Sequence, residues 1–160
     1  MNLDLIARKN LELTQTMRTG EKRGTLLWVL DKTKTAMGKR LMRTYIEQPL
    51  VNCATITKRL SSVEELHDND IFRQDVMAQL GGIFDLERLM TRIVYGSATP
   101  RELVSLLFTA RRLPALKKSL QARRLPCCEI HGQIDTLEDV GALISSALIE
   151  DPPTRLKTAA

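Results

Sequence analysis

Residues 99–121, TPRELVSLLFTARRLPALKKSLQ, contain the strongest structural signal in this chain. Thr99 is a good N-cap, Pro100 suits the first helical position, and Glu102 stands where a capping box places its carboxylate. Leucine and alanine then recur on one helical stripe, at positions 103, 106, 107, 110 and 113. Pro114 should end or kink this helix, yet Leu116 and Leu120 continue the stripe. A continuous helix over 100–121 would be about 30 Å long at ~1.5 Å per residue.

Capping residues, glycines and prolines predict further helices on both sides of this segment. These helices run from Thr35 to Pro49, from Asn52 through Leu66, from about Asp70 to Gly81-Gly82, from about Asp85 to Gly96, and from about Thr136 through Leu148 to Pro152-Pro153. Residues 3–13 are expected to form a short helix, 20–24 a charged turn, and about 122–134 a linker. No stretch alternates apolar and polar residues for long enough to require a sheet. The predicted fold class is therefore all-α, an irregular multi-helix domain with one long capped helix.

Composition bounds the class of protein without naming a function. With 160 residues, 43% of them hydrophobic and 27% charged, the chain fits one globular domain over 1–160. Three cysteines, two of them adjacent, argue against a secreted disulfide-built fold. No apolar stretch approaches the ~20 residues that cross a bilayer, and residues 1–10 contain no signal-peptide core. We therefore expect a cytoplasmic protein without membrane contact.

The sequence offers no catalytic or metal-binding constellation. Cys127, Cys128 and His131 lie close together, but His67 and Cys53 are far from them, and a structural zinc site needs four placed ligands. The glycines never form a phosphate-binding G-x-x-x-x-G-K-[ST] loop, and a G-x-S-x-G nucleophile elbow is absent. We therefore expect no catalytic residue, no metal and no bound cofactor.

Basic side chains are the remaining functional candidates. Lys39 and Arg43 share one face of the helix that follows Thr35, and Arg111, Arg112 and Lys118 line the polar side of the long helix. The net charge of +5 permits weak contacts with a DNA backbone through these five residues. No aromatic residue lies among them to stack on a base. A solvated face opposite the leucine stripe remains the simpler interpretation.

Gly38 lies inside a predicted helix, where alanine is favoured by up to about 1 kcal/mol. We expect this glycine to permit close packing of helices.

Short motifs then carry a family resemblance along nearly the whole chain. In order, they are Asn10–Leu13, Leu26–Asp31, Thr35–Leu41, Glu47–Leu50, Arg59–Leu66, Asp85–Arg92, Ala98–Leu103, Leu113-Pro114 and Ala147–Pro153. Together they resemble the core domain of bacterial MutS mismatch-repair proteins. The segment around Cys127-Cys128 departs most from the family pattern.

The resemblance implies a function for the longer parent protein and a structural role for this chain. Proteins of this family are dimers that encircle mismatched DNA, work with a MutL-type partner and couple recognition to an ATPase that uses ATP and Mg. Their helical core carries levers between the DNA-gripping clamp and the ATPase. This chain would be the first part of that core, ending just before the clamp insertion. The family's Phe-x-Glu mismatch reader and Walker motif are not present in it.

Two classes of function therefore remain in play. The first is a non-catalytic core and lever fragment, with the helix from Pro100 as the lever. The alternative is an independent helical nucleic-acid-binding module, which only the positive charge supports.

Overall fold

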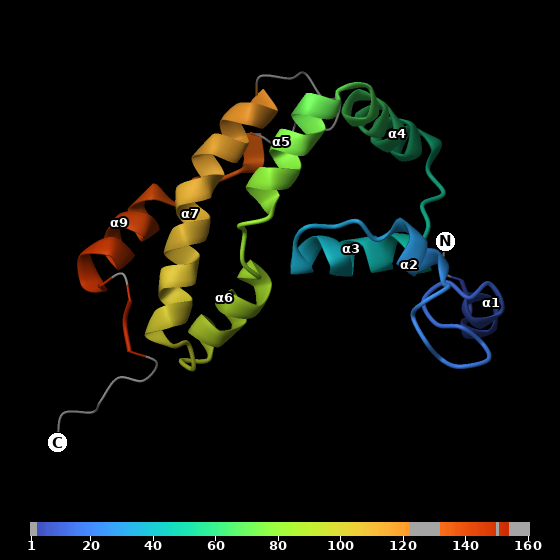
Figure 1. Ribbon diagram of the computed structural model, residues 1–160, viewed down its shortest axis with the longest axis horizontal. Coiled ribbons are helices and arrows are strands. Elements are labelled where there is room, and N and C mark those ends of the chain that lie inside the picture. Colours follow the sequence, from blue (N-terminus) through green and yellow to red (C-terminus); the bar gives the residue numbers. More distant parts are fainter. Residues whose placement is uncertain (1–2, 122–131, 150, 154–160) are drawn as a thin grey trace. The chain divides into compact units, whose positions relative to one another are not determined.

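The computed structural model describes residues 3–121, 132–149 and 151–153. All regular structure in these residues is helical, which confirms the all-α prediction (Figure 1). The helices are α1 (Leu5–Asn10), α2 (Leu26–Leu30), α3 (Ala36–Glu47), α4 (Cys53–Asp68), α5 (Asp70–Leu80), α6 (Leu86–Val94), α7 (Pro100–Gln121) and α9 (Glu138–Ala147). Within these described ranges, no helix is long and apolar enough to cross a membrane. The predicted linker over about 122–134 lies outside the described residues, apart from its end at 132–134.

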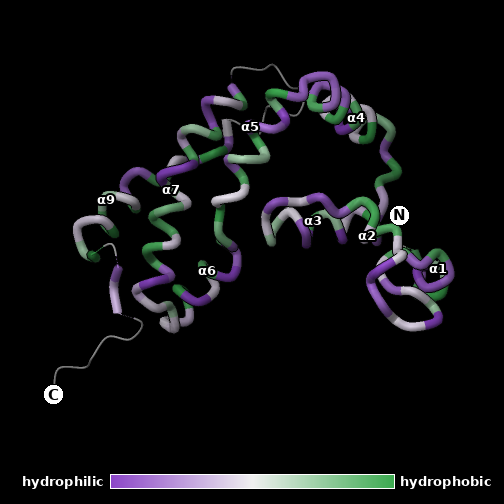
Figure 2. The backbone as a smooth tube through the Cα atoms, viewed as in Figure 1, coloured by the Kyte–Doolittle hydropathy of each residue, from purple (hydrophilic) through white to green (hydrophobic). Residues whose placement is uncertain are grey.

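Contacts divide the chain into two compact units, Met1–Leu60 and Ser61–Ala160, with the boundary inside α4. The single core domain expected over 1–160 stays a prediction. Figure 2 shows hydrophobic and hydrophilic residues alternating along the helices, as expected where a helix buries one face and exposes the other.

The first unit is held together around Thr25, which is 1% exposed. Its hydroxyl accepts a hydrogen bond from the Trp28 amide (3.2 Å) and donates one to the Lys22 carbonyl (2.7 Å), so it caps α2. The amide of Leu27 donates to the Leu13 carbonyl at 3.0 Å, and both leucine side chains are buried. The sequence analysis did not predict α2, because its five residues, LLWVL, are too short to show a helical period.

Most of the predicted helix boundaries are confirmed. The Thr35 hydroxyl accepts from the Gly38 amide at 3.0 Å, and the Asn52 side chain accepts from the Thr55 amide at 3.1 Å. At the start of α6, the Asp85 carboxylate accepts a hydrogen bond from the Arg88 amide at 3.4 Å. At its end, Gly96 directly follows the C-cap residue Tyr95 and has a φ of +66°. The helix expected from Thr136 begins at Glu138 instead, after Leu137 in a left-handed conformation.

The reason expected for Gly38 is wrong. A Cβ added there would lie 3.0 Å from the Thr35 hydroxyl and 3.6 Å from the Thr33 Cβ, and its three nearest atoms all belong to these two threonines. The glycine therefore makes room for the cap of its own helix.

The second unit is organised around α7. Buried Leu106 and Leu107 of this helix form a core with Leu89 of α6 and Ile144 of α9. A second apolar cluster surrounds Phe72 of α5 and includes Leu120 near the end of α7. One helix therefore packs against three others, α5, α6 and α9 (Figure 1).

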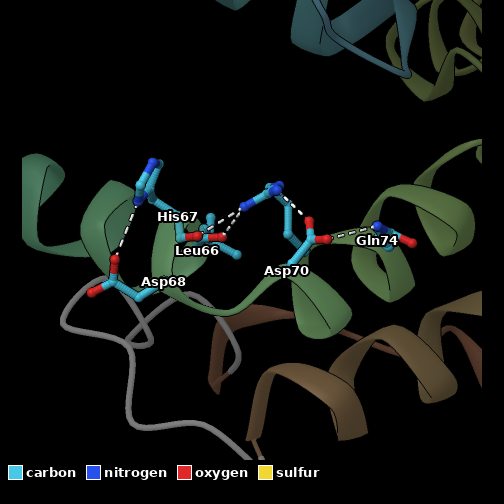
Figure 3. A network of polar contacts seen from close by, with 6 residues as sticks. Leu66, His67, Asp68, Asp70 and Gln74 are labelled. Atoms are coloured by element: carbon cyan, nitrogen blue, oxygen red, sulfur yellow. Dashed lines mark hydrogen bonds and ion pairs between the residues drawn. The ribbon is translucent and has the colours of Figure 1, made fainter.

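Arg73 holds the joint between α4 and α5 (Figure 3). Its guanidinium donates to the carbonyl oxygens of Leu66 (2.8 Å) and His67 (3.0 Å) and pairs with Asp70, whose carboxylate also accepts from the Gln74 side chain at 3.0 Å. The last carbonyls of a helix have no partner within it, so Arg73 satisfies those at the end of α4.

Candidate functional site

The long helix α7 is the structural centre of the candidate site. It is continuous from Pro100 to Gln121 and passes through Pro114, so the proline does not end the helix. Eight of its residues are buried: Pro100, Val104, Leu106, Leu107, Thr109, Ala110, Leu113 and Leu116. Burial from Pro100 to Leu116 means that α7 is supported along most of its length.

The capping box at the start of α7 forms only in part. The Glu102 carboxylate accepts from the Thr99 amide at 2.8 Å, as the box requires. The Thr99 hydroxyl does not accept from the Glu102 amide but donates to the same carboxylate at 2.9 Å. The Glu102 amide instead donates to the Thr99 backbone carbonyl at 3.0 Å. The sequence thus predicted the right residues, while the hydroxyl has the opposite role.

A second partner holds the same carboxylate from α6. The Arg92 guanidinium lies 2.6 Å from Glu102 Oε1 and donates to the Ser97 carbonyl at 3.0 Å. The hydrogen bond from the Thr99 amide, together with the Thr99 hydroxyl and the Arg92 charge, holds the pKa of Glu102 below its ordinary value. Glu102 therefore joins the end of α6, the following turn and the start of α7.

The middle of α7 receives the turn between α5 and α6. The Thr109 hydroxyl, 0% exposed, accepts from the Phe84 amide at 3.2 Å and donates to the Ser105 carbonyl at 3.0 Å. One turn further on, the Arg112 guanidinium occupies the place where a side chain at Gly82 would begin. Gly82 is therefore required for the close approach of Arg112 to this turn.

Polar side chains also tie down the C-terminal third of α7. Gln79 of α5 donates to Ser119 at 2.8 Å, and the Ser119 hydroxyl donates to the Asp75 carboxylate at 3.2 Å. Lys117 donates to the backbone carbonyl of Ile134 at 2.8 Å. Neighbouring segments therefore contact α7 through specific hydrogen bonds at its start, middle and end.

The sequence analysis missed Arg92, Thr109 and Ser119 as positioning residues. Their partners lie on other helices or turns, and no local spacing announces such pairs. The one sequence feature that could have indicated such a contact is Thr109, which lies among the apolar residues of this helix, because a buried hydroxyl needs a hydrogen-bond partner.

Two of the predicted DNA-contact residues lie on α3 in the first unit. Lys39 lies 3.6 Å from Asp31, and Arg43 donates to Glu47 at 2.7 Å across one helical turn. Hydrogen bonds from Thr33, with Lys39 adding its charge, lower the pKa of Asp31. Both basic residues thus have acidic partners on the protein, although their side chains are 66% and 53% exposed.

The other three lie on α7 in the second unit. Arg111 and Lys118 are exposed and about two helical turns apart, which places them on one face. Arg112 is also exposed, but its guanidinium is packed over Gly82. The five residues therefore fall into separate sets on two units, with Arg111 and Lys118 the pair best placed for an outside phosphate.

The second unit contains a shallow apolar cavity of about 360 Å³ between α7 and α9. Its wall includes Leu107, Ala110, Pro114, Leu137 and Gly141, with Arg111 and Glu138 among its polar members.

No group of three metal-ligating side chains occurs within residues 3–121, 132–149 and 151–153. Cys53 is exposed with a free thiol, and His67 contacts Asp68 at the end of α4. The predicted Cys127, Cys128 and His131 grouping lies outside the described residues.

The regular structure of the described residues is all helical, and one long, laterally supported helix organises the second unit, as in a helical core domain. The sequence model of the family "MutS domain III" matches residues 6–160, nearly the whole chain. The chain belongs to this family, which confirms the resemblance seen in its motifs.

Curated relatives agree with this assignment. The chain is 46% identical over 158 residues to the DNA mismatch repair protein MutS of Alkaliphilus oremlandii, covering 98% of this chain and 18% of the relative. The MutS proteins of Lachnoclostridium phytofermentans and Desulforamulus reducens are each 44% identical over 98% of this chain, which covers 17% and 18% of their lengths. The chain thus spans less than a fifth of the length of these relatives.

Proposed function

We propose that this chain is the non-catalytic helical core of a MutS-type mismatch-repair protein, with α7 as a lever. The observation that supports this role most directly is the lateral support of α7 by Glu102, Thr109 and Ser119 at its start, middle and end. A helix held in this way moves as one body, so a displacement at one end reaches the other.

In the full-length protein, the lever couples mismatch recognition to ATP binding and hydrolysis by other domains. Mismatched double-stranded DNA, a second copy of the protein and a MutL-type repair protein are the partners of that parent, and ATP with Mg is its cofactor. We place the parent in the cytoplasm. Membership of the MutS family supports these assignments.

Coupling is a free energy shared between two sites, typically about 1–3 kcal/mol, and a lever without both sites has nothing to couple. We therefore expect the 160-residue chain neither to bind nor to hydrolyse ATP. Isothermal titration with Mg-ATP and a phosphate-release assay test this, and a full-length MutS relative provides the positive control. Saturable ATP binding by the chain would overturn the non-catalytic role.

Any DNA binding by this chain should be weak, salt-sensitive and indifferent to mismatches, because phosphate contacts carry no sequence information. A gel-shift titration with matched homoduplex and G·T heteroduplex measures this directly. Equal affinity for the two duplexes is expected. A reproducible mismatch preference would mean that the core itself reads DNA.

The five basic residues Lys39, Arg43, Arg111, Arg112 and Lys118 remain the proposed backbone contacts. The strongest test pair is Arg111→Gln with Lys118→Gln, which should reduce the slope of log affinity against log salt by about 1 per lost contact. Lys22→Gln with Arg23→Gln removes the same charge from the exposed 20–24 turn and is the matched control.

An independent nucleic-acid-binding module is the alternative function. It requires sub-micromolar affinity for a short duplex at physiological salt together with a steep salt slope, because phosphate contacts dominate such binding. Binding weaker than micromolar at physiological salt, with both double variants alike, argues against it.

A further inference from the structure

Residues 151–153, which come after α9 in the sequence, lie beside the start of α7 (Figure 1). Arg101 Nε donates to the carbonyl oxygen of Pro152 at 3.1 Å, and Arg101 Nη2 lies 3.5 Å from the Asp151 carboxylate. Pro152 is buried, although Asp151 and Pro153 on either side of it are exposed. One arginine in the first turn of α7 therefore holds residues 151–153.

The arginine projects from a well-anchored turn. On one side of it, Pro100 is buried, and on the other, Glu102 is bound by Thr99 and Arg92. The bonds from Thr99 and Arg92 to Glu102 fix this turn without any contact to residues 151–153.

The captured segment is itself stiff. Pro152 and Pro153 each have φ locked near −65°, and a residue that precedes a proline is restricted to extended conformations, as Asp151 and Pro152 are here. With so few free dihedral angles, one hydrogen bond to the Pro152 carbonyl fixes the direction of the whole segment.

We propose that Arg101 is a positioning residue, which latches residues 151–153 to the start of α7 and passes their displacement to this helix directly. Without the latch, a displacement of this segment reaches α7 only through α9 and its apolar packing. The transmission of a displacement to α7 matters only if α7 is a lever, so this part rests on the proposed function. The contact between Arg101 and residues 151–153 can be tested in the 160-residue chain.

The hydrogen bond from Arg101 to the Pro152 carbonyl, rather than the ion pair with Asp151, holds residues 151–153 at the start of α7. The Asp151 side chain is 90% exposed and that of Arg101 is 55% exposed, and ion pairs with this exposure contribute little. Pro152 is buried, and the Nε–H of Arg101 donates to its carbonyl oxygen at 3.1 Å in a partly buried place. Lysine retains the charge but has no planar Nε–H donor.

Arg101→Lys and Asp151→Asn therefore separate the two contacts. Backbone ¹⁵N relaxation of the 160-residue chain gives the order parameter of the Asp151 amide. In the wild type it should be about 0.85, which is typical of rigid backbone. In Arg101→Lys, we expect the order parameter of the Asp151 amide to fall below about 0.6, which is typical of flexible backbone. In Asp151→Asn, it should stay near the wild-type value. Arg111→Lys, on the same helix, is the matched control and should change nothing at Asp151.

A second measurement detects transmission, which a merely structural arginine would not show. Pro153→Ala should shift the amide resonances of Leu103 and Val104 in the wild-type background and leave them unchanged in the Arg101→Lys background. The order parameters of α9 and the melting temperature should stay the same in both backgrounds.

Two results would overturn the latch. One is a rigid Asp151 amide in Arg101→Lys, and the other is loosening of α7 and α9 to the same degree as Asp151. Neither result depends on DNA or ATP, so failure of the latch is distinguishable from failure of the lever. A mismatch preference in the gel-shift assay would end the lever role and leave these order parameters as they are.

Discussion

At the scale of single residues, Thr99 shows how a correct sequence motif can form with altered geometry. Its hydroxyl donates to the Glu102 carboxylate, a charge-assisted bond in a partly buried place. Thr99→Ala should therefore lower the free energy of unfolding by about 1 kcal/mol, the net value of one hydrogen bond. Urea unfolding measures the change, and Thr99→Ser, which keeps the hydroxyl, is the control. Identical curves for the alanine variant and the wild type would refute the assignment.

Glu102 should make stability depend on pH. Its pKa is lowered in the folded state, so the folded protein favours the ionised form more than the unfolded chain does, where the pKa is about 4.3. The resulting stabilisation is present above pH 4.3 and is lost as the pH falls through the lower, folded-state pKa. The urea midpoint of the wild type should thus exceed that of Glu102→Gln at pH 7, and the two should converge in acid. A constant gap at every pH would contradict this linkage.

Gly38→Ala should fail to stabilise the protein, although alanine is the better helix former by up to about 1 kcal/mol. The added Cβ would lie only 3.0 Å from the Thr35 hydroxyl oxygen, which accepts the hydrogen bond from the Gly38 amide. Gly141→Ala in α9 is the matched control. Its Cβ would meet Leu107 at an ordinary 3.7 Å, so this variant should gain stability. A clear rise in melting temperature for Gly38→Ala would show that the cap can yield.

At the scale of helices, the sequence predicted elements whose ends carry a local chemical signal. A capping side chain bonds to an amide only three positions away, and a left-handed residue ends a helix at its own position, so both can be predicted from local sequence. The residues that mark boundaries in this way are Thr35, Asn52, Asp85 and Gly96. The helix α2 was missed because its five apolar residues show no period, and it is held by Thr25 together with a backbone bond between Leu27 and Leu13.

Pro114 is the main departure from helix rules within α7. It lacks the amide that would donate to the carbonyl of Ala110, yet the helix continues through it. Pro114→Ala restores this donor and should raise the free energy of unfolding by roughly 1 kcal/mol, the net value of one hydrogen bond. Denaturant unfolding with an unchanged m-value would confirm the gain. A loss of stability would mean that the proline fits the cavity wall better than an alanine.

At the scale of the whole molecule, sequence patterns could not reveal which elements are tied together. Arg101 and Pro152 lie 51 residues apart, and Gln79 and Ser119 lie 40 apart. Such pairs depend on the packing of α7 against its neighbours, which no local rule specifies. The predicted basic residues likewise divide between the two units, because proximity in sequence says little about a shared surface.

The described residues expose many large apolar side chains, which should make the 160-residue chain associate with itself. Trp28 and Val29 on α2 are 53% and 55% exposed, and Val94 and Tyr95 at the end of α6 are 78% and 80% exposed. Large apolar patches normally mark interaction sites, and the relatives of this chain are more than five times as long, so other domains can cover such surfaces. Static light scattering should show a mass that rises with concentration.

Trp28 is the chain's only tryptophan, so its fluorescence reports on α2 during association. Emission should move to shorter wavelength, and acrylamide quenching should weaken, as the mass increases, because association removes the indole from water. Val29→Lys adds a charge to the same exposed helix and should reduce association while leaving the urea midpoint unchanged. A strictly monomeric chain at high concentration would show that these side chains do not act as a contact surface. Association with unchanged Trp28 emission would instead move the contact from α2 to another exposed apolar region, such as the end of α6.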